Sequence, residues 1–401
     1  MPDAAVLRTP PHAGRLEGLT SLRFFAALAV LLLHFFRLED SAPAAEVAGR
    51  PVREALLSTA GFLSNAHLAV DFFFVLSGFV LAHVYVPKLA AGRFGYGEFL
   101  RRRVARLVPL HLATLAAFLG LFWLATLAGR GPKDAAHFDA AALPFQLTLT
   151  HAWGFCERLT FNGPSWSISA EWAAYLAFPA VVWLLTKVRP AVSLALSAAW
   201  FLAWQHGLDG GPLTSRTADF GVLRIAAEFP LGVAAWRAFD AGLRSGRGAV
   251  VLAAAGAVAV WAGMHFGRPA AAVFGFAAVI AGVAAADRAG RLRWLSARPL
   301  VHGGEISYSI YMTHALVQVV LDRAAGPLLD SGRATLADGL LLAGVAATLV
   351  VSHLSYRWIE KPAQRWLTAG PAKALPPVVL VHAADAAGLP RREPSGRLAS
   401  R

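Results

Sequence analysis

Long apolar segments separated by short polar ones dominate the chain from residue 19 onward. A membrane-spanning helix needs about 20 mostly apolar residues, because it must cross roughly 30 Å of hydrocarbon at about 1.5 Å per residue. The pattern predicts an all-α, polytopic helical membrane protein with about ten transmembrane helices. The predicted spans have the approximate bounds 19–37, 62–85, 108–128, 166–186, 190–206, 219–238, 248–266, 270–286, 304–325 and 336–357.

Composition supports this class. Of the 401 residues, 57% are hydrophobic and 15% are charged, whereas a soluble domain averages about 45–50% apolar and about 25% charged residues. The formal net charge is +13. In a soluble protein this excess would suggest a nucleic-acid partner. Here the positive-inside rule explains it, since Lys and Arg collect in cytoplasmic loops. With no nucleic-acid motif in the chain, we expect no such partner.

The loop charges also predict the orientation. With the N-terminus inside, the loop after the second span is cytoplasmic and carries Lys88, Arg93, Arg101, Arg102, Arg103 and Arg106. Later inside loops are also basic, so both termini are predicted to be cytoplasmic. We expect a cytoplasmic segment over 1–18, a membrane domain over 19–366 and a disordered basic tail over 367–401. Residues 1–18 are polar and show no cleavage site, so no cleavable signal is predicted.

Two ionisable residues lie in the first span, Arg23 and His34. An ionisable side chain in hydrocarbon costs roughly 2.5–3.5 kcal/mol by insertion scales, so it usually pairs, lines a cavity or serves a function. Eleven residues make about three helical turns, which puts both side chains on one face, roughly 16 Å apart along the axis. Alternatively, Arg23 reaches the lipid headgroups and His34 is an interfacial histidine.

Two acidic residues are expected at the depth of His34. Asp71 begins the second span and Glu171 lies in the first turns of the fourth. A carboxylate beside an imidazole can fix its tautomer, as in general-base catalysis. Alternatively, Asp71 stabilises a helix N-terminus and Glu171 belongs to a structural ion pair. Arg224 and Glu228, four residues apart, are expected to neutralise each other.

Further polar groups lie at the cytoplasmic ends of spans. Arg101, Arg102, Arg103 and Arg106 precede the third span; they could anchor the topology or contact anionic lipid, but arginine forks also suit phosphorylated ligands. Ser307, Tyr308, Tyr311 and His314 recur at three- or four-residue spacings in the ninth predicted span, which puts several of them on one face, and Glu360 closes the tenth. Either of these two sets could instead join helices to one another.

Taken together, these motifs resemble the acyltransferase-3 family of bacterial membrane O-acyltransferases over roughly residues 15–366. The resemblance rests on Arg23 and His34 with ten residues between them, the arginine run into Val108 and Pro109, and four motifs in a fixed order: DFFFVLSGFVL, PSWSISAEW, ISYSIYMTH and SYRWIEKP. We expect a stand-alone member, without the C-terminal hydrolase-like domain that some members carry.

The resemblance implies transfer of an acyl group, commonly acetyl, from cytoplasmic acyl-coenzyme A to a hydroxyl of a carbohydrate or glycoconjugate, such as O-antigen or exopolysaccharide. Some members modify macrolides instead. It implies a bacterial inner membrane, contact with membrane lipids, and no metal. Cys156, the single cysteine, provides neither a disulfide nor a cysteine metal cluster. The acyl chain, the acceptor and the oligomeric state are not fixed by the sequence.

In this interpretation His34 is the general base, or alternatively forms an acyl-histidine. Asp71 or Glu171 orients His34 or stabilises its positive charge. The predicted cofactor-binding residues are Arg23, Ser77, Arg101, Arg102, Arg103, Arg106, Tyr308, Tyr311 and His314. Two rivals remain: a transporter or flippase, because charged residues in spans also mark substrate pathways, and a non-catalytic sensor or scaffold.

Overall fold

The computed structural model describes residues 16–38, 50–59, 61–129, 135–206, 211–242 and 246–369. Every regular element in these ranges is helical, as the sequence predicts. The long helices are α1 (Glu17–Phe36), α4 (Ala69–Ala90), α5 (Tyr96–Leu127), α7 (Trp166–Thr186), α8 (Pro190–Trp204), α9 (Gly221–Gly242), α10 (Gly246–His265), α11 (Pro269–Arg288), α13 (Ser307–Asp330) and α14 (Ala334–Ser355). Short helices are α3 (Pro51–Leu57), α6 (Leu143–Leu147), α12 (Arg298–Glu305) and α15 (Lys361–Thr368).

Each of the ten predicted spans overlaps one long helix, although α5 begins at Tyr96, well before the predicted 108. Seven segments within the described ranges are both long and apolar enough to cross a membrane. Helix α8 has only 15 residues. Helices α9 and α13 carry several charged and polar residues, so they are not among the seven. A chain with seven such helices is a multi-pass membrane protein. The crossing of α8, α9 and α13, and the sides of the termini, stay predictions.

The two predicted end segments fall largely outside the described residues. Of the N-terminal segment 1–18, residues 16–18 are described, and α1 begins at Glu17. Of the tail 367–401, residues 367–369 are described, and α15 ends at Thr368. The helical structure of the membrane domain therefore extends two residues beyond its predicted end at 366.

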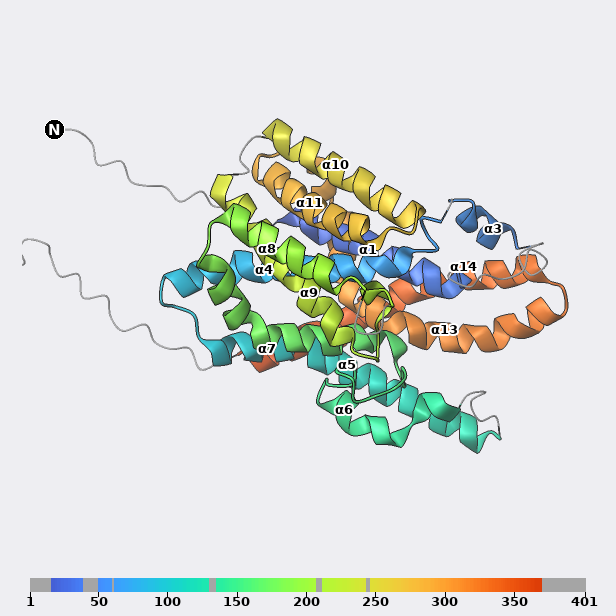
Figure 1. Cartoon of the computed structure of the whole chain (residues 1–401). Helices are drawn as coiled ribbons and strands as arrows, with labels where there is room; N and C mark the ends of the chain where they lie inside the picture. The colour runs from blue at the N-terminus through green and yellow to red at the C-terminus, as the bar shows by residue number, and fades with distance from the viewer. Residues whose placement is uncertain are drawn as a thin grey trace, which may run out of the picture.

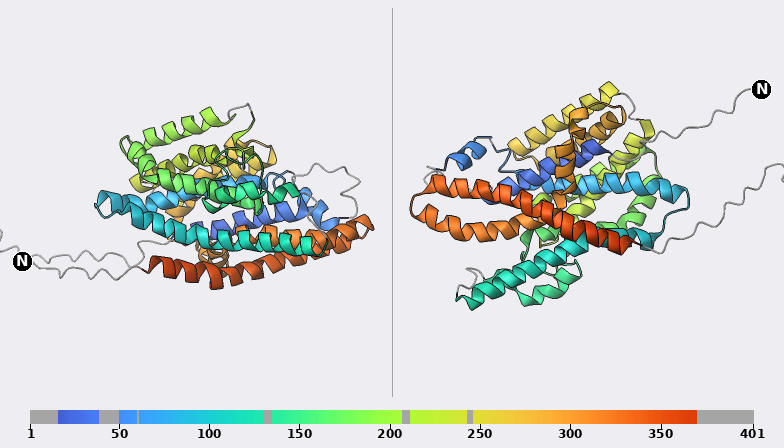
Figure 2. Two further views of the ribbon diagram at one scale, coloured as in Figure 1. Left: turned by 90° about the horizontal axis from the view of Figure 1, so that it is seen from below. Right: turned by 180° about the vertical axis from the view of Figure 1, so that it is seen from behind.

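Helix α1 lies at the centre of the bundle (Figure 1). It contacts α4, α11, α13 and α14. Helices α10 and α11 pack closely against each other on one side of the bundle, and α13 packs against α14 on another. On a third side α6 lies beside α5 (Figures 1 and 2). Helix α1 therefore has neighbours on several sides, and its Arg23 and His34 side chains are partly buried.

The outer surface is apolar where a soluble protein would be polar. Large side chains such as Trp123, Leu184, Val251 and Val258 are each more than 60% exposed. Charged side chains including Arg224, Asp71 and Glu228 are instead almost fully buried. Exposed apolar patches of this kind mark membrane contact, and charges inside a membrane bundle face its interior or a cavity.

Two glycines allow α4 and α9 to come into backbone contact. A Cβ at Gly78 would collide with the carbonyl oxygen of Phe229, and a Cβ at Gly232 would collide with the carbonyl oxygen of Val75. Small residues at a helix–helix contact permit this close approach in membrane proteins. The contact is relevant to the site because it fixes Ser77 and Asp71 of α4 relative to Arg224 of α9.

Replacing Gly232 with alanine is expected to lower the free energy of unfolding by about 1–3 kcal/mol, because the added methyl group must separate two packed backbones. Gly120→Ala is the matched control: a Cβ there meets no neighbour within 4 Å, and alanine favours a helix interior by about 1 kcal/mol over glycine. Thermal melting of the two purified variants measures both effects. Equal melting temperatures would contradict the close contact.

Candidate functional site

Two cavities lie within the helix bundle. The arginine cavity has a volume of about 150 Å³, and its polar lining residues are Arg23, Ser77, Arg103, Arg106, Ser167, Glu171, Tyr175, Ser307, Tyr308 and Tyr311. The histidine cavity has a volume of about 400 Å³ and is lined by His34, His67, Trp166, Arg224 and polar residues of the 214–217 loop, among others. Val70 and Tyr311 line both cavities, so the two share a wall.

Helix α1 contributes one ionisable residue to each cavity. Arg23 lines the arginine cavity and His34 lines the histidine cavity. The helix ends two residues after His34, where Arg37 adopts the left-handed conformation with φ 48° and its backbone N–H donates to the His34 carbonyl. The side-chain amide of Gln318 donates a hydrogen bond to the same carbonyl oxygen at 2.8 Å. His34 is therefore held at a capped helix end, next to a cavity.

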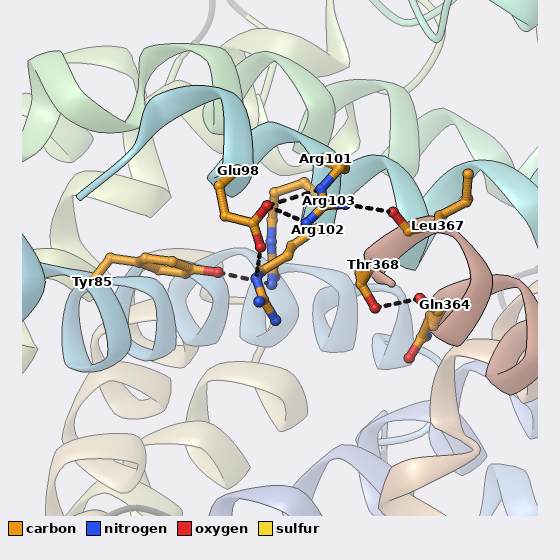
Figure 3. Close-up of polar contacts among 8 residues, drawn as sticks. All are labelled: Tyr85, Glu98, Arg101, Arg102, Arg103, Gln364, Leu367 and Thr368. Carbon is orange, nitrogen blue, oxygen red and sulfur yellow. Dashed lines mark hydrogen bonds and ion pairs between the residues drawn. The ribbon is translucent and has the colours of Figure 1, made fainter. Parts of the chain in front are cut away.

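The arginine cluster divides into two pairs. Arg101 and Arg102 both bind Glu98, at 2.5 Å and 2.6 Å, and their side chains are substantially exposed. Figure 3 shows both guanidinium groups at this carboxylate, with Arg101 also donating to the Leu367 carbonyl at 3.3 Å. Neither residue lines the arginine cavity. The prediction that all four arginines form one ligand site is therefore not matched by their positions.

Arg103 lines the arginine cavity without a carboxylate partner in the described part of the chain. Its guanidinium lies over the rings of Tyr85, Phe99 and Tyr175, 5.6–5.9 Å from their centroids. Its NH2 group reaches the Tyr85 hydroxyl at 3.5 Å (Figure 3), and its Nε is buried without an acceptor. Arg103 thus presents a positive charge that no acidic side chain neutralises directly.

Arg106 also lines the cavity but is paired with Glu360. Glu360 is buried and ends a π-helical turn, Tyr356–Glu360, between α14 and α15. It also accepts hydrogen bonds from Ser309 at 2.9 Å and Gln364 at 3.1 Å. A π-helical turn inserts an extra residue into a helix and is frequent at functional sites; here it sets the carboxylate against the arginine.

Glu171 is held by hydroxyl groups from two helices. Ser77 of α4 donates to its Oε1 at 2.8 Å, and Tyr175 donates to the same oxygen at 2.6 Å. All three residues line the arginine cavity. Glu171 therefore belongs to the arginine cavity, and in the described structure it makes no hydrogen bond to His34.

Two tyrosines of α13 form part of the cavity wall. The Tyr308 hydroxyl donates to the Leu107 carbonyl at 2.6 Å. The Tyr311 hydroxyl donates to the Pro164 carbonyl at 3.0 Å and accepts from Ser167 at 2.9 Å. Both hydroxyls are therefore satisfied by the protein, so these residues shape the cavity through their rings.

Asp71 does not orient His34 as the sequence suggests. Its two carboxylate oxygens bind the Nε and NH2 groups of Arg224, with Nε to Oδ1 at 2.6 Å, in a fully buried ion pair. Arg224 therefore pairs with Asp71 and not with Glu228, contrary to the prediction from their spacing. Glu228 lies against Asp71, and neither of its oxygens has a hydrogen-bond donor among the described residues. A bidentate arginine–carboxylate pair is the stronger contact.

The ring that contacts His34 is that of His314. Their Nδ1 and Nε2 atoms are 3.0 Å apart, and the two rings are within 12° of parallel. His314 is 1% exposed. The sequence placed His314 among the cofactor-binding residues; in the structure it lines neither cavity and lies behind His34.

Several residues that line the histidine cavity were not predicted from the sequence. His67, Trp166, Thr214, Ser215 and Thr217 line it beside His34. Trp166 lies inside the PSWSISAEW motif, but its spacing alone does not indicate a cavity. The three hydroxyl residues lie in the connection between α8 and α9, where no periodic pattern exists to predict which way a side chain points.

A buried serine–histidine pair lies close to the histidine cavity but does not line it. The Ser165 hydroxyl and the His151 Nε2 are 3.1 Å apart, and both residues are buried. Burial lowers the pKa of His151 to about 4, so the ring is neutral near pH 7. A nucleophile must be reachable by its substrate, and Ser165 lines neither cavity. We assign this pair a structural role.

Comparison with known proteins agrees with the motifs. A family model described as an acyltransferase domain matches residues 16–357. Acyltransferase MdmB of Streptomyces mycarofaciens is 32% identical over 396 residues, covering 89% of this chain and 94% of that protein. A Komagataeibacter xylinus protein provisionally named membrane-bound transacylase BcsY is 29% identical, with 81% and 83% of the two chains covered. No solved structure matches.

Proposed function

Since the chain belongs to the acyltransferase-3 family of membrane acyltransferases, we propose that it moves an acyl group, most simply acetyl, from acyl-coenzyme A to a hydroxyl of a carbohydrate or glycoconjugate. One observation carries this proposal: two cavities of different chemistry share the wall of Val70 and Tyr311. A transfer between two substrates needs a site for each and a place where the reacting atoms meet.

The arginine cavity is the donor site in this proposal. Its lining includes three arginines and one glutamate, an excess of positive charge. No hydrogen bond or ion pair holds Arg23 among the described residues, and Arg103 has no carboxylate partner there. Unpaired arginines next to a cavity suit an anionic ligand such as the phosphate groups of coenzyme A. The apolar residues of the same lining, such as Leu76 and Val80, suit the pantetheine arm.

The histidine cavity is the acceptor site. It is the larger of the two, and its lining combines hydroxyl side chains with the Trp166 ring. Hydroxyl groups can both donate to and accept from the hydroxyls of a sugar. The acceptor hydroxyl would approach His34 from this cavity, while the thioester would reach the same place from the arginine cavity, past Val70 and Tyr311.

The chemistry needs one base, and we assign that role to the Nε2 atom of His34. Nε2 removes the proton from the acceptor hydroxyl as its oxygen attacks the thioester carbonyl carbon. When the carbon–sulfur bond breaks, the sulfur takes a proton from the imidazolium, giving an ester and free coenzyme A thiol. In the alternative route His34 itself attacks the thioester and forms an acyl-histidine that the acceptor then cleaves.

The proposed orientation puts the arginine cavity toward the cytoplasm. Positive-inside counting supports this assignment, because the segment from Lys88 to Arg106, which ends α4 and begins α5, carries six basic residues. Coenzyme A is a cytoplasmic metabolite, so the donor would enter from the side where Arg103 lies. We further propose that all ten long helices cross the bilayer of the bacterial inner membrane, with both termini cytoplasmic.

Arg103→Gln should raise the KM for acetyl-coenzyme A by about 10- to 100-fold, because a charge-assisted hydrogen bond contributes about 1.5–3 kcal/mol. Arg102→Gln is the matched control, since Arg102 is paired with Glu98 outside the cavity. Its KM should change little. Steady-state rates of thiol release at varied acetyl-coenzyme A concentration give both values. Equal effects in the two variants would contradict the assignment of the donor site.

The test of the proposed function uses acetyl-coenzyme A labelled in the acetyl group. Purified membranes containing the protein are incubated with it and with an extract of the host's glycans and lipids. We expect release of free thiol together with label in a hydroxylamine-sensitive ester on a glycan. Label that stays on the protein when the acceptor is omitted would favour the acyl-histidine route.

The transporter alternative predicts a different result. A glycan flippase would move substrate across a vesicle membrane without cleaving the thioester, and no thiol would appear. The family membership and the donor-site charges favour the enzyme. Thiol release that depends on the acceptor extract would decide between them.

A further inference from the structure

We infer that His314 is the positioning residue of the site: it fixes the tautomer of His34 so that the Nε2 atom of His34 is an unprotonated base facing the acceptor cavity. This inference rests on the proposed function, in which His34 is the base. It replaces the earlier assignment of His314 to cofactor binding and supplies the orienting group that neither Asp71 nor Glu171 provides.

The inference starts from the far side of the His314 ring. The Nδ1 atom of His314 is 3.3 Å from the Ile310 carbonyl oxygen, one turn earlier in α13. A carbonyl oxygen can only accept a hydrogen bond, so the hydrogen of this contact belongs to His314 Nδ1. In a neutral imidazole the other nitrogen is then an acceptor.

The second step follows from burial. His314 is 1% exposed, and no acidic side chain contacts it among the described residues. Burying an unpaired charge is far more costly than burying a neutral ring, so His314 is neutral. Its Nε2 atom therefore accepts, and the partner atom 3.0 Å away, His34 Nδ1, must carry the donated hydrogen.

The third step concerns the remaining nitrogen of His34. With its hydrogen on Nδ1, the neutral ring has a free electron pair on Nε2. No hydrogen bond to this atom is found among the described residues, and His34 lines the histidine cavity. The hydrogen bonds from the Ile310 carbonyl through His314 to His34 therefore leave His34 Nε2 as an unprotonated base at the place where the acceptor hydroxyl would lie.

Helix α13 holds His34 at a second point. Gln318, one turn after His314, donates to the His34 backbone carbonyl at 2.8 Å. The ring and the backbone of His34 are therefore both tied to α13. A base held on two sides keeps its direction during catalysis, as orienting groups behind a catalytic histidine do.

Two substitutions of His314 separate positioning from packing. His314→Leu removes the acceptor and keeps an apolar side chain of moderate size. His314→Gln keeps an acceptor oxygen near the place of Nε2. We expect kcat to fall by about 100-fold in His314→Leu, a large part of the 10²–10⁴-fold that a general base contributes. His314→Gln should recover most of this loss, and the KM for acetyl-coenzyme A should be unchanged in both.

The control is another histidine pair with the same distance between its nitrogen atoms, although its rings are inclined at 64° and not nearly parallel. His302 Nε2 and His353 Nδ1 are also 3.0 Å apart, and neither residue lines a cavity. His353→Leu should therefore leave kcat unchanged. In addition, the double variant His34→Ala with His314→Leu should be no slower than His34→Ala alone, because a residue that acts through His34 has no effect without it.

A chemical modification measurement tests the same inference without depending on enzymatic activity. Diethylpyrocarbonate modifies the unprotonated nitrogen of a neutral imidazole, and mass spectrometry reports the modified fraction of His34. We expect His34 to react several times more slowly in folded His314→Leu than in the wild type, and His314→Gln to react at nearly the wild-type rate. Elution as a single species in size-exclusion chromatography checks that each variant is folded.

The outcomes distinguish the two proposals. A raised KM with unchanged kcat in His314→Leu would return His314 to a cofactor-binding role and overturn the inference. A folded His314→Gln with the full defect of His314→Leu would overturn it too, as would equal modification of His34 in all proteins. Full activity in His34→Ala would instead contradict the proposal that His34 is the general base. A wild type inactive toward acetyl-coenzyme A would count against the proposed donor, and the modification rates would still decide the inference.

Discussion

Replacing His34 with glutamine should lower kcat for acyl transfer by about 10²–10⁴-fold, the usual contribution of a general base. Glutamine can still donate a hydrogen bond to His314 through its amide, so it keeps the contact at 3.0 Å that the wild-type ring makes. It has no nitrogen that can accept a proton. The loss would therefore come from the missing base and not from a collapsed cavity wall.

The measurement is the rate of thiol release from acetyl-coenzyme A at saturating donor, with the acceptor extract present. His34→Ala is expected to show the same loss. The KM for the donor should be little changed, because His34 lines the histidine cavity and not the arginine cavity, which is the proposed donor site. A folded His34→Gln protein that transfers acetyl groups at the wild-type rate would exclude both the direct route and the acyl-histidine route.

Replacing Arg224 with leucine should produce the largest loss of stability, about 3–5 kcal/mol of the free energy of unfolding, since removing one partner of a buried ion pair leaves an uncompensated charge. Arg224 is 2% exposed and Asp71 is fully buried. Without the guanidinium, Asp71 and Glu228 would lie against each other with no cation at the contact. The membrane interior offers little water to stabilise either acid.

The matched control is Arg37→Leu. Arg37 pairs with Asp322 at 3.2 Å, but its side chain is 61% exposed, and exposed ion pairs typically contribute about 0–1 kcal/mol. Thermal melting in one detergent compares the two variants with the wild type. We expect Arg224→Leu to melt far lower or to fail to accumulate in membranes, and Arg37→Leu to melt close to the wild type. Similar melting of both variants would contradict a structural role for the Arg224 pair.

The division of the four arginines into two pairs can be seen in the sequence when Glu98 is included. Arg103 and Arg106 are three residues apart and share a helix face, whereas Arg101 and Arg102 are three and four residues after Glu98. Pairs at these spacings interact on a helix surface. The spacing from Glu98 therefore predicts that Arg101 and Arg102 pair with it on the surface, which leaves Arg103 and Arg106 for the cavity.

Other parts of the site could not be read in this way. The bond between His34 and His314 joins residues 280 positions apart, and that between Asp71 and Arg224 joins residues 153 apart. A periodic pattern tells which residues share a face of one helix, but it does not tell which face of another helix lies opposite. Asp71 and His34 were expected to meet because of similar depth, and depth does not fix the rotation of a helix.

The sequence by itself determined the all-helical class, the approximate location of the long helices and the family, because these depend on local apolar length, on helical spacing and on motifs in a fixed order. It also put Arg23 and His34 on one face of α1. The tertiary structure alone decided the partners: His314 behind His34, Arg224 at Asp71, Glu360 at Arg106, and the wall of Val70 and Tyr311 between the cavities. These depend on how separate helices rotate and pack against one another, which no single segment encodes.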